Sequence, residues 1–245
     1  MGWRIVDLFC DALLAVTYPH GCALCGASVE ARADWPACAE CWKAAPIFGA
    51  DESLCSKCGA KWQGAKTDAC RLCVAEEFTA ARAVGSYDGA LRAAVLELKR
   101  TPKIGARLAD LLTAVARCEP LCLATRIVAV PLHVERRRER GFNQAEVIAR
   151  AVGKRLALPV DEKSLVRLAH TPTYRSLMDA RARRGSVEKA FAVAAPRLVQ
   201  RERILLVDDV LTTGATASAA ARALLDAGAE AVYVLSIARA AFVAR

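Results

Sequence analysis

Residues 204–216 read Ile-Leu-Leu-Val-Asp-Asp-Val-Leu-Thr-Thr-Gly-Ala-Thr, an apolar run followed by two acids and a short polar loop. The apolar run 204–207 predicts a buried strand, and apolar residues at helical spacing over 216–227 predict a helix after the loop. Asp208 and Asp209 therefore lie at the carboxyl end of a strand, which is where open α/β sheets bind their ligands.

Two adjacent carboxylates in such a place are costly as mere structure, because like charges repel and burial disfavours both. A ligand with two neighbouring hydroxyls, such as those of a ribose, would offset this cost with charge-assisted hydrogen bonds. The loop then places N–H groups and hydroxyls at a helix N-terminus, which suits a phosphate. Its residues are Thr212, Thr213, Gly214, Ala215 and Thr216. Gly214 permits close backbone approach or a positive φ. The alternative is a capped helix after an acidic turn.

From about Phe78 onward, apolar runs alternate with helical patterns. We expect strands at 83–87, 127–131, 204–207 and 231–238, and helices at 91–99, 104–116, 144–156 and 216–227. Such alternation is typical of βαβ units, so we predict an α/β fold with a mostly parallel sheet and flanking helices. Gly228 follows the last predicted helix and is expected to be its left-handed cap.

Eight of the eleven cysteines form four Cys-x-x-Cys pairs. Two such pairs facing each other supply four thiolates at tetrahedral geometry, which is a closed structural zinc site. We predict one or two structural Zn²⁺ ions with the pairs assigned sequentially; the first pair could instead join the fourth, and the second the third. A redox role for one pair is a further alternative. The expected ligands are Cys22, Cys25, Cys38, Cys41, Cys55, Cys58, Cys70 and Cys73.

Composition divides the chain in two. Residues 1–77 hold all the paired cysteines and all four tryptophans, and we expect an N-terminal helix and a cysteine-rich zinc module there. Residues 78–245 would form the α/β domain. The tryptophans either fill the small core of the zinc module or stack on nucleic-acid bases. Asp7 and Asp11 interrupt the apolar segment 2–16, so it fits an amphipathic helix better than a signal peptide or membrane span. Reduced, metal-binding thiols indicate the cytoplasm.

The net charge of +9 is concentrated in one segment. Between Pro131 and Arg203 there are seventeen Lys and Arg against eight Asp and Glu, so we expect an anionic partner there, either a polyphosphate or a nucleic acid. The densest runs are Arg136-Arg137-Arg138 with Arg140, and Arg181 with Arg183 and Arg184. Each could also be a solvated helix face. His133 is the one histidine expected beside the site.

The run 204–216 resembles the motif that binds phosphoribosyl pyrophosphate (PRPP) in type I phosphoribosyltransferases. A second combination is similar to the signature of the ComF/GntX family: Val128-Ala129-Val130-Pro131-Leu132, then Arg136, Arg140, Gly141, Phe142, Asn143 and Gln144. Tyr87-Asp88-Gly89 followed by Leu98-Lys99 also resembles that family. Its members join an N-terminal zinc module to a phosphoribosyltransferase domain, so the resemblance covers nearly all of the chain.

The resemblance implies roles for individual residues. Asp208 and Asp209 would hold the ribose hydroxyls, and would be the catalytic residues of an enzyme, while residues 212–216 would bind the 5-phosphate. The pyrophosphate contacts it implies are Leu132, Arg136, Arg140 and Lys99. Mg²⁺ is expected to arrive bound to PRPP rather than in a protein cage.

The sequence departs from the family in one loop, which often reads Thr-x-x-Gln and later Arg-x-x-Asn before Ala-Phe. Here Thr173-Tyr174-Arg175 lacks the glutamine and Arg183-Arg184-Gly185-Ser186 lacks the asparagine, although Ala190-Phe191 is present. We therefore carry over no role for those two polar groups.

Two functions are compatible with the resemblance. The family is associated with natural competence, so we expect a PRPP-binding accessory factor in DNA uptake, with single-stranded DNA and competence proteins as further partners. The alternative is an active phosphoribosyltransferase that moves ribose 5-phosphate from PRPP to an unknown acceptor and releases pyrophosphate. After Ser236 the only aromatic residue is Phe242. A C-terminal hood that reads an acceptor base is therefore not expected, which favours the accessory role.

Overall fold

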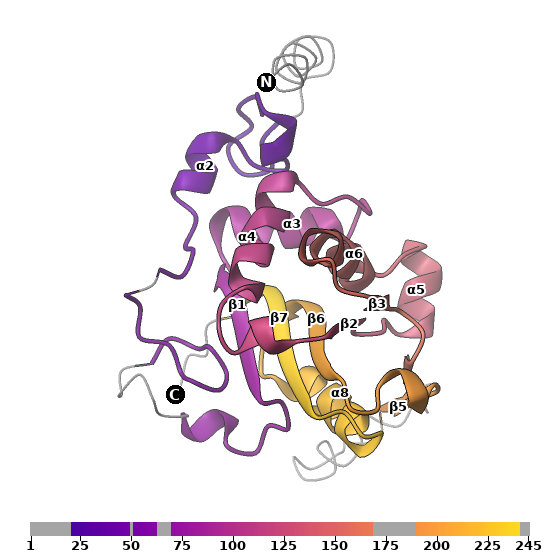
Figure 1. The fold of residues 1–245 in the computed structure, drawn as a ribbon. Coiled ribbons are helices and arrows are strands. Elements are labelled where there is room, and N and C mark those ends of the chain that lie inside the picture. Colours follow the sequence, from indigo (N-terminus) through magenta and orange to yellow (C-terminus); the bar gives the residue numbers. More distant parts are fainter. Residues whose placement is uncertain (1–20, 50, 63–69, 169–189, 241–245) are drawn as a thin grey trace, which may run out of the picture.

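The computed structural model describes residues 21–49, 51–62, 70–168 and 190–240 (Figure 1). Its centre is a five-stranded parallel sheet with strand order β1-β7-β6-β2-β3. The strands are β1 (Ala80–Ser86), β2 (Arg126–Ala129), β3 (Val160–Asp161), β6 (Arg203–Leu211) and β7 (Ala231–Arg239). This topology confirms the α/β class expected from the sequence.

Helices cover both faces of the sheet. α3 (Gly89–Leu98) and α4 (Ala106–Ala116) lie between β1 and β2, α6 (Gln144–Leu156) between β2 and β3, and α8 (Ala215–Asp226) between β6 and β7. Parallel crossovers are right-handed, so connections that run in opposite directions along a sheet place their helices on opposite faces. From the strand order, α3, α4 and α6 therefore share one face and α8 covers the other (Figure 1).

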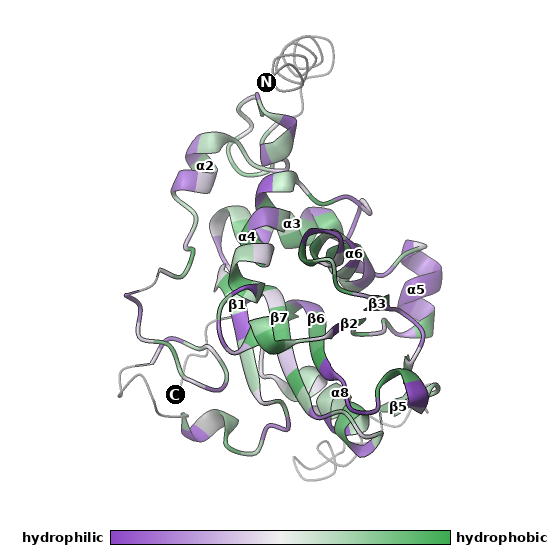
Figure 2. Ribbon diagram, viewed as in Figure 1, coloured by the Kyte–Doolittle hydropathy of each residue, from purple (hydrophilic) through white to green (hydrophobic). Residues whose placement is uncertain are grey.

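The two central strands form the core because their sequences are almost wholly apolar. Residues 204–207 of β6 are 0% exposed, and residues 232–235 of β7 are at most 4% exposed. Figure 2 shows hydrophobic residues along these strands and a hydrophilic surface on α5 (Val134–Arg140). The burial of strands on both faces explains why they read as continuous apolar runs rather than as an alternation.

The strands and helices predicted for the α/β domain are present among the described residues, with shifted ends. β6 continues four residues beyond Val207, so both acids belong to the end of the strand rather than to the loop. After the strand, Gly214 is the N-cap residue of α8 and has a left-handed φ of 92°. Gly228 follows the helix with a φ of 98°, which confirms the expected left-handed cap.

Several elements were not predicted. α5, which contains the arginine run for which a solvated helix face was the alternative, has Val134 as its single apolar residue, so no apolar periodicity marks it as a helix. β4 (Leu165–Arg167) and β5 (Phe191–Val193) are three residues each and pair antiparallel as a separate two-stranded sheet. Strands this short have no room for a recognisable alternation. Two short 3₁₀ helices, η3 (Leu121–Leu123) and η4 (Pro196–Leu198), complete this part.

In the cysteine-rich part, the residues that the structure describes form three short helices: η1 (Arg32–Asp34), α2 (Ala39–Lys43) and η2 (Arg71–Cys73). It packs directly on the α/β part. Arg107 of α4 donates to Asp34 at 2.7 Å, and a Cβ on Gly105 would lie only 2.1 Å from the Trp35 carbonyl oxygen. Trp42 is 2% exposed and donates to the Asp34 carbonyl, so this tryptophan fills the core of the module rather than a base-stacking surface.

Over the described ranges, no helix combines the length and the hydropathy that a membrane span requires.

Candidate functional site

The carboxyl ends of two neighbouring strands, β6 and β2, open into a pocket of about 210 Å³. β6 supplies Asp208 and Asp209, and the segment after β2 supplies Pro131 and Leu132. The remaining walls come from the end of α3, from α5, from the start of α6, from β4 and from α8. Side chains from strands and helices that are far apart in the sequence thus meet at the edge of the sheet where α/β folds bind ligands.

Asp208 and Asp209 are the only acidic side chains among the described residues that line this pocket. Asp208 Oδ1 accepts a hydrogen bond from the Asp209 N–H at 2.8 Å, and Lys99 Nζ lies 4.0 Å from Asp209 Oδ2. Burial and then the charge of Asp209 raise the pKa of Asp208 to about 8. With this pKa, the Asp208 carboxyl is mainly protonated near neutral pH.

The loop at 212–216 lies at the start of α8. Thr216 lines the pocket, whereas Thr212, Thr213 and Ala215 are exposed to solvent and do not line it. Thr213 Oγ1 accepts a hydrogen bond from the Ala215 N–H at 3.3 Å. The left-handed Gly214 turns the chain from strand into helix, so the loop and the N-terminal end of α8 adjoin the pocket beside Asp208 and Asp209.

A basic wall faces the acid pair. Lys99, Leu132, Arg136 and Arg140, expected from the sequence to meet one anion, all line the same pocket. Arg137 does not: its guanidinium makes two hydrogen bonds to the Glu146 carboxylate. The arginine run of α5 thus divides into residues that face the pocket and residues that do not.

Three polar residues of the pocket were given no role from the sequence: Arg167, Asn143 and Gln144. Arg167 ends β4, and its Nε is buried without a hydrogen-bond partner among the described residues. Burial and then the charge of Arg136 lower the pKa of Arg167, while the charge of Asp208 opposes this shift. No motif surrounds Arg167, so only the fold brings it to the site.

The sequence did contain a signal for Asn143 and Gln144, because both belong to the family signature that ends at Gln144. Asn143 caps α6: its Oδ1 accepts from the Ala145 N–H at 3.1 Å, and its Nδ2 donates to the Val130 carbonyl at 3.0 Å. This side chain therefore ties the start of α6 to the end of β2. Gln144 is 3% exposed, and its Nε2 has no partner within the described ranges.

Some expected residues are elsewhere. His133 caps α5 by accepting a hydrogen bond from the Glu135 N–H, and it does not line the pocket. Arg181, Arg183, Arg184 and the loop that includes Thr173 lie outside the described residues, as does the segment 2–16.

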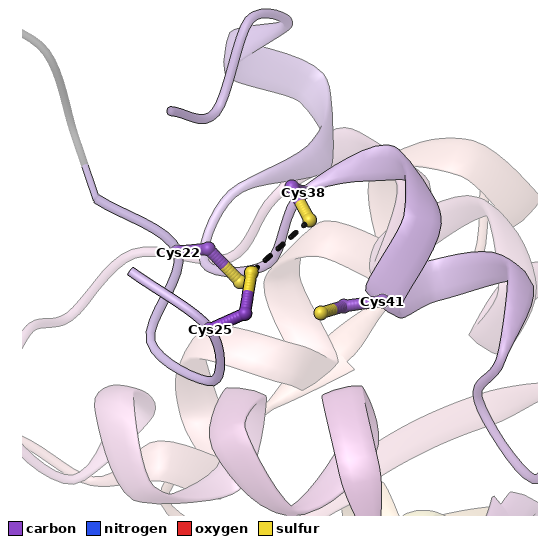
Figure 3. Close-up of side chains that lie close together, drawn as sticks. All are labelled: Cys22, Cys25, Cys38 and Cys41. Carbon is purple, nitrogen blue, oxygen red and sulfur yellow. Dashed lines mark hydrogen bonds between the residues drawn. The ribbon is translucent and has the colours of Figure 1, made fainter. Parts of the chain in front are cut away.

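The eight paired cysteines form two separate groups of four, assigned sequentially, and in each the sulfur atoms all lie within 4.8 Å of one another. Figure 3 shows the first cluster, defined as Cys22, Cys25, Cys38 and Cys41, with its side chains gathered around one centre. In the second cluster, which contains Cys55, Cys58, Cys70 and Cys73, the sulfur pairs 55–73 and 58–70 are 3.6 Å apart. Tetrahedral zinc with Zn–S bonds of about 2.3 Å separates its sulfurs by about 3.8 Å. Both clusters therefore fit structural zinc, and the crossed pairing is wrong.

Comparison with known proteins identifies the family. The DNA utilization protein YhgH of Escherichia coli O157:H7 is 32% identical over 232 residues, which cover 91% of this chain and 99% of that protein. This chain belongs to the ComF/GntX family. Competence protein F of Haemophilus influenzae is 35% identical over 125 residues, covering 51% of this chain and 54% of that protein. ComFC of Bacillus subtilis is 32% identical over 106 residues, covering 42% and 39%.

The N-terminal part of this ComF family member has a match of its own. Residues 13–74 match the family model described as a double zinc ribbon domain, in agreement with the two cysteine clusters. Similar solved structures include a glutamine PRPP amidotransferase from B. subtilis (18% identity, TM-score 0.39, 58% of this chain and 30% of that chain). Another is adenine phosphoribosyltransferase from Leishmania tarentolae (15% identity, TM-score 0.38, 59% and 74%).

Proposed function

We propose that this ComF family member binds PRPP in the pocket at the ends of β6 and β2. The observation that carries the proposal is that one pocket joins two adjacent carboxyl groups to four long basic side chains, those of Lys99, Arg136, Arg140 and Arg167. The hydroxyls of a ribose need acceptors and a diphosphate needs cationic donors, and PRPP offers both within one molecule.

The acid pair would hold the ribose. Asp209, beside Lys99, supplies an ionised acceptor for one hydroxyl. Asp208 is protonated in much of the unliganded protein, because burial and the charge of Asp209 raise its pKa to about 8. Two hydroxyl donors would favour the ionised form of both carboxyls, so PRPP binding is expected to release a proton near neutral pH.

The phosphate groups would lie to either side of the ribose. The 5-phosphate would meet the loop 212–216 at the N-terminus of α8, where backbone N–H groups and the helix dipole favour an anion. The pyrophosphate would face Arg136, Arg140 and Arg167. Asp208 and Asp209 are the only acids that line the pocket within the described ranges, so Mg²⁺ would be held chiefly by the phosphate oxygens of the ligand.

Calorimetric titration of PRPP with Mg²⁺ tests this proposal. Wild-type protein should bind, and the double variant Asp208→Asn with Asp209→Asn should bind too weakly to measure, because it loses both charged acceptors. Asp110→Asn is the matched control, since Asp110 is an acid of α4 that pairs with Arg155. This variant should bind PRPP with wild-type affinity. Equal affinity in the wild type and the double variant would remove the acid pair from the site.

The proposed cellular role is that of an accessory factor in DNA uptake. Support comes from relatives named competence protein F and DNA utilization protein. The pocket itself is too small for a polynucleotide, so DNA would lie outside it. Arg138 of α5 is exposed and does not line the pocket, and it offers a phosphate contact on the basic surface of that helix.

Single-stranded DNA binding can be measured by fluorescence anisotropy over a range of salt concentrations. The logarithm of the affinity should fall with the logarithm of salt, and Arg138→Ala should lower the slope by about 0.7 for one lost phosphate contact. Lys163→Ala serves as a control because Lys163 lies beyond α6 and outside the pocket. Affinity that does not change with salt would contradict backbone binding and leave PRPP as the sole anionic partner.

A second candidate function, an active phosphoribosyltransferase, is favoured by the arrangement of charges. Three arginines face the side where pyrophosphate would leave, and such fixed cations stabilise a developing charge. The described residues offer no evident general base at the pocket beyond the two acids. Pyrophosphate release during incubation of PRPP with a panel of nucleobases and amines would establish turnover. Binding of PRPP without release in any mixture would leave the accessory role.

The division into a module at 1–77 and a domain at 78–245, and a cytoplasmic location, belong to the same proposal. The division is supported by the position of β1, which begins at Ala80 just after the second cysteine cluster. The location is supported by the ten described cysteines, none of which forms a disulfide, and by the eight of them that are grouped as metal ligands.

A further inference from the structure

The second cysteine cluster is packed against the α/β sheet. The Ala81 N–H of β1 donates to the Lys57 carbonyl at 2.6 Å. A Cβ on Gly59, whose φ is 65°, would lie 2.5 Å from the Ala81 carbonyl oxygen, so only glycine permits this approach. The loop between Cys55 and Cys58 therefore contacts the backbone of the edge strand.

The chain that leaves this cluster runs directly to α8. It begins at Cys73, whose carbonyl accepts a hydrogen bond from the Glu76 N–H at 3.1 Å. The next N–H, that of Glu77, donates to Ser218 Oγ in the first turn of α8 at 2.9 Å. The Glu77 carboxylate also accepts from the guanidinium of Arg222, one turn further along the helix. Two contacts thus fasten the segment after the last cysteine ligand to the start of α8.

Ser218 continues this connection to the candidate phosphate loop. Its N–H donates to the Gly214 carbonyl at 2.8 Å, so it makes the first helical hydrogen bond of α8 to the N-cap residue. The Glu76 carboxyl group lies against the same turn, since a Cβ on Gly214 would be 3.3 Å from Glu76 Cδ. Ser218 therefore bonds through its hydroxyl to the segment from the zinc module and through its N–H to the loop 212–216.

The loop has little packing of its own. Thr212, Thr213 and Ala215 are exposed, and the hydrogen bond from the Ala215 N–H to Thr213 Oγ1 lies within the loop. Segments with few buried contacts open readily, so their order depends on the elements that hold their ends. One end of this loop is β6, and the other is the first turn of α8, where Ser218 lies.

Zinc would fix the start of the connecting segment. All four cysteines of the second cluster are at most 3% exposed, and their sulfur atoms lie within 4.8 Å of one another. A metal ion bonded to all four holds Cys73 in a defined place, and its loss removes the bonds that order this turn. The position of the Glu77 N–H, only a few residues after Cys73, therefore depends on zinc.

We propose that Ser218 is a positioning residue that couples zinc at the second cluster to the loop 212–216. Zinc fixes Cys73, the segment after Cys73 holds the Ser218 hydroxyl, and the Ser218 N–H holds the turn at Gly214. Loss of this zinc then loosens the loop. Because coupling between two sites is reciprocal, a ligand on the loop also slows the loss of zinc. That the loop is a ligand site rests on the function proposed above; the coupling itself does not.

The first cluster provides an internal control. Cys25 is exposed, and Cys38 and Cys41 are half-buried, so this zinc should leave faster than the buried one. This part of the chain meets the α/β domain at α3 and α4, for example through the Asp34–Arg107 ion pair. Loss of zinc from the first cluster should therefore leave the loop unchanged.

Zinc release to a chromogenic chelator measures the hold of Ser218 on the second cluster. Ser218→Ala should speed the slow phase about threefold to tenfold, which is the effect of one lost hydrogen bond. Ser218→Thr keeps the hydroxyl and should stay near the wild-type rate. Arg107→Ala, which breaks the ion pair to Asp34, should leave the slow phase unchanged. Alanine is the better helix former, so faster release would not come from a weaker α8.

Hydrogen exchange of a peptide spanning 209–218 measures the hold on the loop. In zinc-loaded protein, Ser218→Ala should raise exchange about threefold or more, and Ser218→Thr should not. Arg222→Ala is an independent variant at an exposed position that removes the other contact of Glu77, so it should raise exchange and speed the slow phase as well. An unchanged slow phase in Ser218→Ala, or exchange equal to that of the wild type, would overturn the proposal.

Wild-type protein tests the coupling without a substitution. Exchange of the same peptide should be unchanged after the fast zinc has left and should rise after the slow zinc has left. The rise should be smaller in Ser218→Ala, because the contact that transmits the loss of zinc is already missing. A loop that does not respond to loss of the slow zinc, or that responds equally in both proteins, would contradict the role of Ser218.

PRPP titration keeps the two proposals apart. If PRPP with Mg²⁺ binds to the wild type, Ser218→Ala should weaken it about threefold or more, and bound PRPP should lengthen the slow phase of zinc release. Bound PRPP that leaves the slow phase unchanged would overturn the coupling. If the wild type does not bind PRPP, the proposed function fails, while zinc release and hydrogen exchange still decide the coupling.

Discussion

Asp208→Asn should make the protein more stable while removing one of the two carboxyl groups from its candidate site. In the folded protein, burial and the charge of Asp209 raise the pKa of Asp208 to about 8, from an ordinary value near 3.8. Between these values the folded state holds a proton that the unfolded state has lost, so wild-type stability falls as pH rises. Asparagine is neutral in both states and removes this loss.

The magnitude follows from the pH window. For each pH unit between the two pKa values, the free energy of unfolding of the wild type falls by up to about 1.4 kcal/mol. The upper limit of the loss from pH 6 to pH 8 is therefore about 2.7 kcal/mol. Water in the pocket, together with Lys99 and Arg167 nearby, reduces this figure, and about 1–2 kcal/mol is expected. Acidic pairs in ligand sites commonly carry such a cost.

Urea unfolding at pH 6 and pH 8 in zinc-containing buffer measures the effect. The free energy of unfolding of Asp208→Asn, relative to that of the wild type, should rise by about 1–2 kcal/mol from pH 6 to pH 8. Asp110→Asn, at an exposed acid paired with Arg155, should show no such widening. If the difference in free energy of unfolding between the two proteins is the same at both pH values, or favours the wild type more at pH 8, the assigned environment of Asp208 is refuted.

Four further predictions follow from the site. Gly214→Ala should lower the free energy of unfolding by about 1–2 kcal/mol, because the φ of Gly214 is 92°, and it should also weaken PRPP binding. Gly228→Ala is the control: the φ of Gly228 is 98° but the residue lies away from the pocket, so this variant should lose stability in the same urea assay and keep its PRPP affinity. Arg167→Gln should weaken PRPP at least tenfold by calorimetry but leave ribose 5-phosphate affinity nearly unchanged, and equal losses for both ligands would place Arg167 away from the pyrophosphate. Calorimetry at pH 7 in buffers of different ionisation enthalpy should show up to one proton released per PRPP, and Asp208→Asn should abolish that release. Metal analysis should give two zinc per chain, and chelation should lower the melting temperature; two zinc-free clusters in a folded protein would contradict the ribbon assignment.

The sequence predicted the elements whose residues carry their own pattern. Ile204–Val207 and the apolar residues of 231–238 are buried on both faces, so continuous apolar runs marked them as parallel strands. Regular Cys-x-x-Cys spacing likewise marked both zinc clusters, because ligand geometry is local to each turn. In these segments local chemistry and the final fold agree.

The sequence could not predict what depends on long-range packing. Arg167 sits on a three-residue strand with no motif around it, and only the pairing of β4 with β5 places it in the pocket. Arg239 read as the end of an apolar strand, and only the fold shows that its charged side chain is buried, at 6% exposed. α5 has no buried residue, so the sequence offered only a solvated helix face for its arginine run. The fold decides that Arg136 and Arg140 line the pocket while Arg137 pairs with Glu146.

A crystal structure of the protein with PRPP and Mg²⁺ tests the account most directly. It should show the ribose hydroxyls within hydrogen-bond distance of Asp208 and Asp209, the 5-phosphate on the N–H groups of residues 212–216, and the pyrophosphate among Arg136, Arg140 and Arg167. Density for PRPP elsewhere on the protein, with Asp209 still beside Lys99 and the loop unoccupied, would contradict it.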